Sequence, residues 1–116
     1  MVCTIERTVD LIAKRWSLLV ILEIYKGNQP KRYSHIKKNI EGITPKVLST
    51  RLNELIDESI IKKKIDSSAV PIKTYYSLTR EGKDLIGILS EFKRWSLKWK
   101  VKNSLCKKTD CLDCTL

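Results

Sequence analysis

The spacing of apolar residues predicts helices over the first third of the chain. Between Thr4 and Tyr25 apolar side chains recur every three or four positions, which is the period of an α-helix. We expect one continuous helix here, with Thr4 as its N-cap and Gly27 as its C-terminal stop. A second, shorter helix fits residues 33–40. The chain therefore begins as a helical protein.

A third helix is predicted at residues 44–57. Thr44 is suited to cap it, and Pro45 suits its first position, where a missing N–H costs nothing. Leucines and Ile56 form its inner face. The opposite face carries short polar or basic side chains: Lys46, Ser49, Thr50 and Asn53. A face that meets only water more often carries Glu–Lys pairs, so this helix can approach a polyanion.

The next segment predicts a β-hairpin. Ile60–Ile65 and Ile72–Leu78 are rich in β-branched and aromatic residues, and a polar, Pro-containing turn separates them. Three consecutive lysines lie in the first strand. Their side chains alternate between the two faces, so Lys62 and Lys64 form one set and Lys63 another.

A long helix follows, for which Thr79 is the expected N-cap. Its apolar residues form an approximate heptad stripe: Leu85, Leu89, Phe92, Trp95 or Ser96, and Trp99. The stripe could cover the domain's own core, or it could form a dimer seam with the N-terminal helix. The two tryptophans favour the seam, because aromatic residues concentrate at interfaces.

The order of these elements is that of a winged helix-turn-helix. We expect a mostly α fold with a small β-hairpin (α+β), whose long N- and C-terminal helices form a dimer seam. Residues 1–101 would be the DNA-binding and dimerisation domain, and residues 102–116 a Cys-rich tail.

Composition narrows the class of partner. The chain has 116 residues, enough for one domain, with 23 Lys and Arg against 13 Asp and Glu and a formal net charge of +10. Such an excess favours a polyanion, either nucleic acid or an anionic membrane. The basic residues lie on a hairpin rather than on one amphipathic helix, which disfavours the membrane. The charged first helix is no signal peptide, so we expect a cytoplasmic protein.

Several motifs resemble those of the HxlR family of winged-helix transcription regulators, which are relatives of the MarR type. They are CTIERTVDLI (3–12), KRWSLLVIL (14–22), Gly27 with Arg32-Tyr33, GITPKVLSTRL (42–52) and YYSLTREG (75–82). The resemblance runs from about Cys3 to Trp99. At two places the chain departs from the family pattern: Ala13-Lys14 replace a glycine pair, and Ser59 replaces a glycine that allows positive φ.

The resemblance implies a homodimer on a pseudo-palindromic double-stranded DNA operator. The helix at about 44–57 would lie in the major groove, and the wing at about 60–78 on flanking backbone. The residues that match the binding region are Ser34, Lys46, Ser49, Thr50, Arg51 and Asn53.

Residue chemistry suggests a role for each candidate. Ser49, Thr50 and Asn53 could read base edges, and Lys46 could reach guanine or phosphate. Arg51 points toward the side of the helix, which favours a phosphate contact. The wing lysines, with Lys73 on the return strand, would contact phosphates and supply affinity without sequence information: Lys62, Lys63, Lys64 and Lys73.

The cysteines suggest sensing. In the family that the chain resembles, a cysteine at the place of Cys3 senses oxidants or electrophiles; a helix N-terminus and nearby Arg7 would lower the pKa of its thiol. Cys106, Cys111 and Cys114 form a C-x4-C-x2-C pattern outside the resemblance. Three thiols so close could bind zinc or an iron–sulfur cluster, could form a disulfide, or could be idle.

Other classes of function find less support. The chain has no Gly-rich phosphate loop and a single histidine, His35, so no Ser-His-Asp set exists and we expect no catalytic residues. The alternative to a DNA-binding regulator is a winged helix used for protein–protein contact. Such a module would have an apolar or acidic outer face on its third helix, which this chain lacks.

Overall fold

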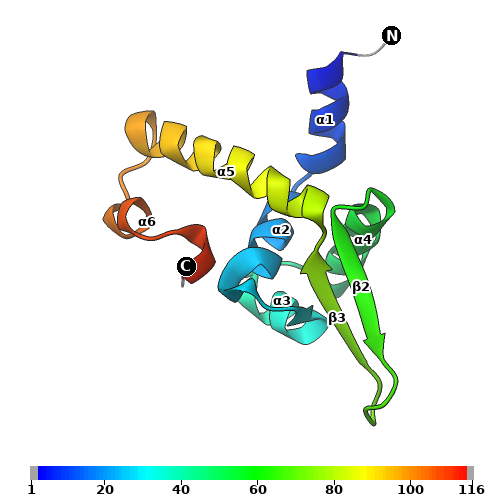
Figure 1. Cartoon of the computed structure of the whole chain (residues 1–116). Helices are drawn as coiled ribbons and strands as arrows, with labels where there is room; N and C mark the ends of the chain where they lie inside the picture. Colours follow the sequence, from blue (N-terminus) through cyan, green and yellow to red (C-terminus); the bar gives the residue numbers. More distant parts are fainter. Residues whose placement is uncertain (1–2, 115–116) are drawn as a thin grey trace.

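The computed structural model describes residues 3–114, which form helices around a small sheet (Figure 1). Its elements, in chain order, are α1 (Thr4–Ile12), α2 (Ser17–Tyr25), the 3-10 turn η1 (Lys26–Asn28), β1 (Lys31–Arg32), α3 (Tyr33–Asn39), α4 (Pro45–Asp57), β2 (Ile61–Asp66), β3 (Lys73–Leu78), α5 (Arg80–Trp99), α6 (Ser104–Lys108) and the 3-10 turn η2 (Cys111–Asp113). The predicted winged helix-turn-helix is confirmed.

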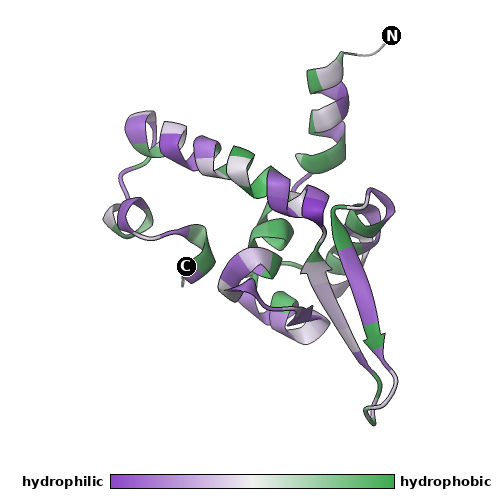
Figure 2. Ribbon diagram, in the orientation of Figure 1, coloured by the Kyte–Doolittle hydropathy of each residue, from purple (hydrophilic) through white to green (hydrophobic). Residues whose placement is uncertain are grey.

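The core lies where α2, α3, α4 and the sheet meet. The largest fully buried side chains come from these four elements: Val20, Ile21, Ile36, Leu48, Leu52, Leu55 and Ile61. In Figure 2 α2 is mostly apolar, whereas α4 combines apolar and polar residues. Burying these side chains removes apolar surface from water and so positions α4 against the sheet.

The predicted N-terminal helix is wrong in one respect, because it is two helices. α1 ends at Ile12, and α2 begins at Ser17 after Trp16, which has a left-handed φ of 81°. None of the nine residues of α1 is buried, whereas α2 buries five. The break lets α2 turn into the core while α1 projects away from it (Figure 1). The helical period continues through residues 13–16, so periodicity alone could not show this break.

The ends of these helices also differ in part from the prediction. Cys3, not Thr4, is the N-cap residue of α1, and Thr4 is its first helical residue. Gly27 follows the end of α2 with a φ of 72°, as expected of a helix stop.

The sheet has three antiparallel strands in the order β1-β3-β2. The β2–β3 hairpin is the predicted wing, with Ile61 opposite Leu78 and Lys64 opposite Tyr75. The short β1 strand, which pairs Lys31 with Tyr76, was not predicted. Two residues are too few for a periodic signal, and only the tertiary pairing defines this strand.

The entry to the wing depends on two small residues. Ser59 adopts a φ of 61°, so the left-handed conformation of the usual glycine is kept despite the side chain. At Gly82, a Cβ atom would lie 2.2 Å from the Ile60 carbonyl oxygen. The first turn of α5, capped by the Thr79 hydroxyl, therefore packs directly on the backbone before β2.

The apolar stripe of α5 divides between two tasks. Leu89 is buried and Leu85 is half-buried, so this part covers the core. Ile88, Phe92, Trp95 and Trp99 are each more than half exposed. The exposed part consists of these four residues, whereas the predicted stripe began at Leu85 and included Leu89 but not Ile88.

The tail folds back along the molecule. α6 and η2 follow α5, and η2 lies against η1 and α2 (Figure 1). Lys93 Nζ of α5 donates a hydrogen bond of 2.5 Å to the Thr109 carbonyl oxygen, which ties the tail to α5. Within residues 3–114, the structure shows no helix whose length and apolar character would suffice to cross a bilayer.

Candidate nucleic-acid interface

The outer face of α4 presents the predicted residues to solvent. The Thr44 hydroxyl accepts a hydrogen bond from the Val47 backbone N–H at 3.2 Å, and Pro45 begins the helix. Because Leu48, Leu52 and Leu55 are buried on one side, the opposite side must face outward. Exposed there are Lys46, Ser49, Thr50 and Asn53.

One hydroxyl on this face has a defined orientation. Thr50 Oγ1 donates a 2.9 Å hydrogen bond to the Lys46 carbonyl oxygen within the helix. Its lone pairs therefore point outward as an acceptor. Facing a base, Thr50 would accept a hydrogen bond from an amino group rather than donate one.

Arg51 lies at the side of α4, in a different setting from the one predicted. Its Nε donates to the Arg15 carbonyl oxygen at 2.9 Å, and its Nη1 donates to Glu54 Oε1 at 2.6 Å. Lys14 also pairs with Glu54, and this hydrogen bond, followed by that from Arg51, holds the pKa of the Glu54 carboxyl below its usual value. Arg51 therefore joins α4 to the turn between α1 and α2.

The pairing register of β2 and β3 determines which face of the wing each lysine occupies. Lys62 pairs with Ser77 and Lys64 with Tyr75, which places both lysines on the face of the hairpin that also carries Lys73. Lys63 lies on the other face, opposite the buried Tyr76. Lys62, Lys63 and Lys64 are all exposed.

Two further residues lie at the start of α3. Ser34, a predicted binding residue, is exposed in its first turn. The Tyr33 hydroxyl donates a 3.1 Å hydrogen bond to the Pro45 carbonyl oxygen, which fixes α3 relative to the start of α4. The sequence contained the Arg32-Tyr33 pair but gave no sign of this contact.

His35, for which the sequence predicts no catalytic role, lies near two neighbouring side chains. Its Nε2 lies 2.8 Å from Asn39 Nδ2 and 4.0 Å from Glu23 Oε1.

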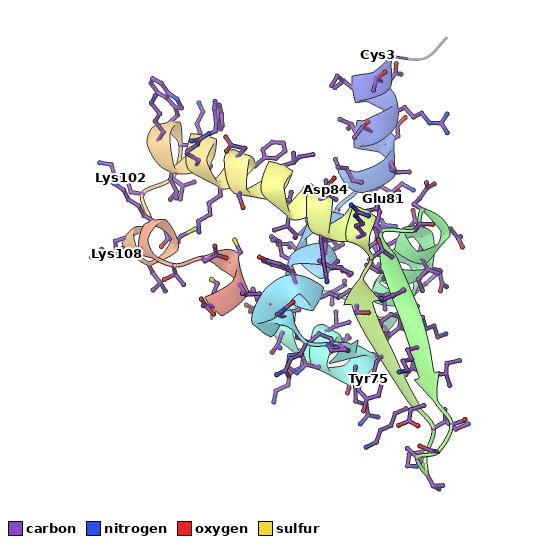
Figure 3. All side chains as sticks on the ribbon, viewed as in Figure 1. Cys3, Tyr75, Glu81, Asp84, Lys102 and Lys108 are labelled. Atoms are coloured by element: carbon purple, nitrogen blue, oxygen red, sulfur yellow. The ribbon has the colours of Figure 1, made fainter. Side chains whose placement is uncertain are left out.

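Cys3 occupies the outer end of α1, far from the core (Figure 3). Its thiol is exposed, and the backbone N–H groups of Glu6 and Ile5 at the helix N-terminus lower its pKa. A lowered thiol pKa raises the fraction of thiolate, which is the nucleophilic form. The lowered pKa and its predicted cause, the helix N-terminus, agree with this, whereas Arg7 is not among the groups that lower it.

The three tail cysteines do not converge. Cys111 lines a cleft against α5, whereas Cys114 lines a cavity beside α2, η1 and α3. All three are half-buried. Across residues 3–114, no three Cys, His, Asp or Glu side chains are arranged to hold a metal ion, and the zinc or iron–sulfur site stays a prediction.

The fold and the polar face of α4 define the class of protein, a winged helix-turn-helix DNA-binding regulator. A family model described as HxlR-like helix-turn-helix matches residues 11–104. The chain belongs to this family, whose members are transcriptional regulators, and is itself a DNA-binding transcriptional regulator.

Individual relatives agree with this assignment. YvaP, an HTH-type transcriptional regulator of Bacillus subtilis, is 36% identical over 94 residues, which cover 81% of this chain and 84% of YvaP. The reduced form of the B. subtilis regulator YodB matches with a TM-score of 0.75 at 30% identity and covers 90% of this chain and all of that one. The oxidised form of the redox regulator HypR gives a TM-score of 0.75 at 27% identity, with 85% and 99% covered.

Proposed function

We propose that the protein binds a pseudo-palindromic operator as a homodimer, with α4 in the major groove and the wing on the flanking backbone. The outward face of α4 carries the proposal, because it combines one cation with three short hydrogen-bonding side chains. Such a face can enter a groove without repelling phosphates and can hydrogen-bond to base edges.

Each side chain on α4 then has a specific task. Asn53 is suited to a bidentate contact with adenine. The Ser49 hydroxyl can pair with either a donor or an acceptor group on a base edge. Thr50 acts as an acceptor. Lys46, in the first turn of α4, reaches guanine or a phosphate.

The wing supplies affinity. Lys62, Lys64 and Lys73 share one face, so a single phosphate backbone can contact all three. Lys63 faces the other way and belongs to a different surface. Each phosphate contact adds salt-dependent, sequence-independent binding.

Arg51 and Ser34 have supporting roles in this proposal. Because Arg51 is held by Arg15 and Glu54, it positions α4 and does not need to contact DNA. Ser34, in the first turn of α3, is placed to donate to a phosphate beside the groove, as the first helix of such motifs crosses the backbone.

The proposed dimer rests on exposed apolar side chains of α1 and α5, the helices near the two ends of the domain. α5 exposes Ile88, Phe92, Trp95 and Trp99 at heptad spacing, and α1 exposes further apolar side chains: Ile5 (70% exposed) and Val9 (50%). A monomer rarely leaves so continuous an apolar stripe in water. A second copy would cover the stripe of α5 with its own α1 and α5.

Cys3 is the proposed redox sensor. It lies at the end of the same α1 helix that would enter the dimer seam, and its thiol is exposed with a lowered pKa. Solved relatives include the reduced form of YodB and both reduced and oxidised forms of HypR. Oxidation or alkylation at Cys3 would alter the seam and so the spacing of the two α4 helices.

Selection of bound fragments from genomic DNA tests the proposal, performed with reduced protein and with diamide-treated protein. We expect a palindromic consensus whose occupancy changes on oxidation, and loss of that change in Cys3→Ser. A consensus whose occupancy does not change on oxidation would support operator binding and contradict the role of Cys3 as a redox sensor. Absence of enrichment in both states would favour a protein-contact module.

A further inference from the structure

α5 has a second exposed face besides its apolar stripe. Successive residues of an α-helix are rotated by about 100°, so residues 90, 93, 94 and 97 lie on the side opposite Ile88, Phe92, Trp95 and Trp99. This second face carries Lys93 and Arg94 and meets the tail. A partner subunit seated on the apolar stripe would leave it accessible.

A cleft of about 490 Å³ lies between this face of α5 and the tail. That volume falls in the range of small-molecule sites, roughly 300–1,000 Å³. The ionisable and nucleophilic side chains that line it come from both walls: Lys93, Arg94 and Lys98 from α5, and Lys107, Asp110 and Cys111 from the tail.

Positive charge prevails in this cleft. Four cationic side chains and one carboxylate line it, an excess of three positive charges, with the Lys98 ammonium 5.1 Å from the centroid of the Trp99 ring. Arg94 pairs with Glu91 outside the lining, which lowers the excess without reversing it. Lys93 donates to a neutral carbonyl of Thr109, so its charge is not compensated there. A concave site lined by one sign of charge raises the local concentration of ions of the opposite sign.

The cleft also contains one nucleophile. Cys111 is a half-buried free thiol in its lining. Cys114 lines the separate cavity beside α3, and Cys3 lies at the far end of α1 (Figure 3). An anion gathered by the lysines would therefore meet the Cys111 sulfur and not those of Cys3 or Cys114.

We propose that this cleft is a modification site that gathers a small anionic disulfide and exposes it to Cys111. Cys111 gives up its proton to solvent, and the thiolate attacks one sulfur of the reagent R–S–S–R. A bond forms between Cys111 Sγ and that sulfur, the reagent's S–S bond breaks, and the second half leaves as RS⁻, which takes up a proton. The cysteine is oxidised and the departing half is reduced.

Three disulfides of different charge test the proposal on the full-length protein. They are glutathione disulfide (anionic), 2-hydroxyethyl disulfide (neutral) and cystamine (cationic). Peptide mass analysis after quenching gives a rate at each cysteine, with Cys3 as the internal reference. We expect the anionic-to-cationic rate ratio at Cys111 to exceed that at Cys3 by about tenfold and to fall as salt is added.

A charge reversal at the cleft separates electrostatics from structural loosening. In Lys107→Glu we expect the rate of Cys111 with glutathione disulfide to fall about fivefold and its rate with cystamine to rise. Loosening of the tail would move both rates in the same direction. Lys108→Glu is the matched control, because it makes the same charge change on a neighbouring residue outside the cleft lining (Figure 3).

Three results would overturn the proposal. They are equal charge preference at Cys111 and Cys3, equal effects of Lys107→Glu and Lys108→Glu, and no modification of Cys111 by any of the three reagents. None of them bears on DNA binding, so this inference and the proposed function can fail separately.

Discussion

At the scale of the residue, Asn53 is the side chain from which we expect the most sequence information. It is exposed on the outer face of α4 and can make two hydrogen bonds to adenine. Asn53→Ala should weaken binding to the selected operator by about 1–3 kcal/mol and leave binding to random DNA unchanged. Titration of both DNAs at one fixed salt concentration checks this. Equal losses on the two would contradict a base-reading role.

A substitution at Ser59 tests how much its left-handed backbone conformation costs in stability. With a φ of 61° it occupies a conformation that costs a residue with a Cβ atom about 1–2 kcal/mol and glycine almost nothing. Glycine also loses more entropy on folding, so we expect Ser59→Gly to raise the free energy of unfolding by about 0.5–1 kcal/mol. Urea denaturation measures the change. Ser59→Ala keeps the Cβ atom and should give no gain.

Cys3 makes a prediction about pH. The helix N-terminus lowers the pKa of its thiol in the folded chain, so the thiolate forms at lower pH than in the unfolded chain. The alkylation rate of Cys3 by iodoacetamide should therefore rise with pH and reach its midpoint earlier in native buffer than in 8 M urea. Coincident midpoints would show that the helix does not stabilise the thiolate.

At the scale of the element, the close packing of α5 on the backbone before β2 explains why the YYSLTREG motif ends in Gly82. A Cβ atom at this position would lie 2.2 Å from the Ile60 carbonyl oxygen, a backbone atom that cannot rotate away. We expect Gly82→Ala to destabilise the fold by about 1–3 kcal/mol. Calorimetry or urea denaturation measures it.

The same helix provides the control. At Gly87 a Cβ atom would meet no atom within 4 Å. Gly87→Ala should stabilise the protein by about 0.5–1 kcal/mol, since alanine favours the helix interior. If both substitutions destabilised the protein equally, the close approach to Ile60 would not explain the loss at Gly82.

At the scale of the whole molecule, the exposed stripe of α5 predicts the state of assembly. Trp95 is 55% exposed in the single chain and would be buried in the seam. Trp95→Ser should raise the dimer dissociation constant by at least about tenfold, because truncating an aromatic anchor costs more than about 1.4 kcal/mol. Sedimentation equilibrium measures it. Ile72→Ser, at an apolar residue of the wing that is 63% exposed, should leave the constant unchanged.

Local signals in the sequence determined much of the fold. Thr44 with Pro45, and Thr79 after Leu78, mark helix starts that the structure reproduces, because capping depends on neighbouring backbone groups alone. The outer face of α4 was predictable for the same reason, since three buried leucines on one side fix what the other side presents. The strands of the wing follow from β-branched and aromatic residues on either side of a polar turn.

Tertiary structure alone decided the rest. The break before Trp16 exists because α2 must pack and α1 need not, a difference that helical periodicity cannot encode. Nothing in the sequence indicated that Arg51 Nε donates a hydrogen bond to the Arg15 carbonyl oxygen, 36 residues away. The C-x4-C-x2-C pattern left a metal site, a disulfide and idle thiols open, and the folded tail turns Cys111 toward α5 and Cys114 toward α3. Local spacing specifies local geometry, whereas contacts between distant segments arise only when the whole chain buries its core.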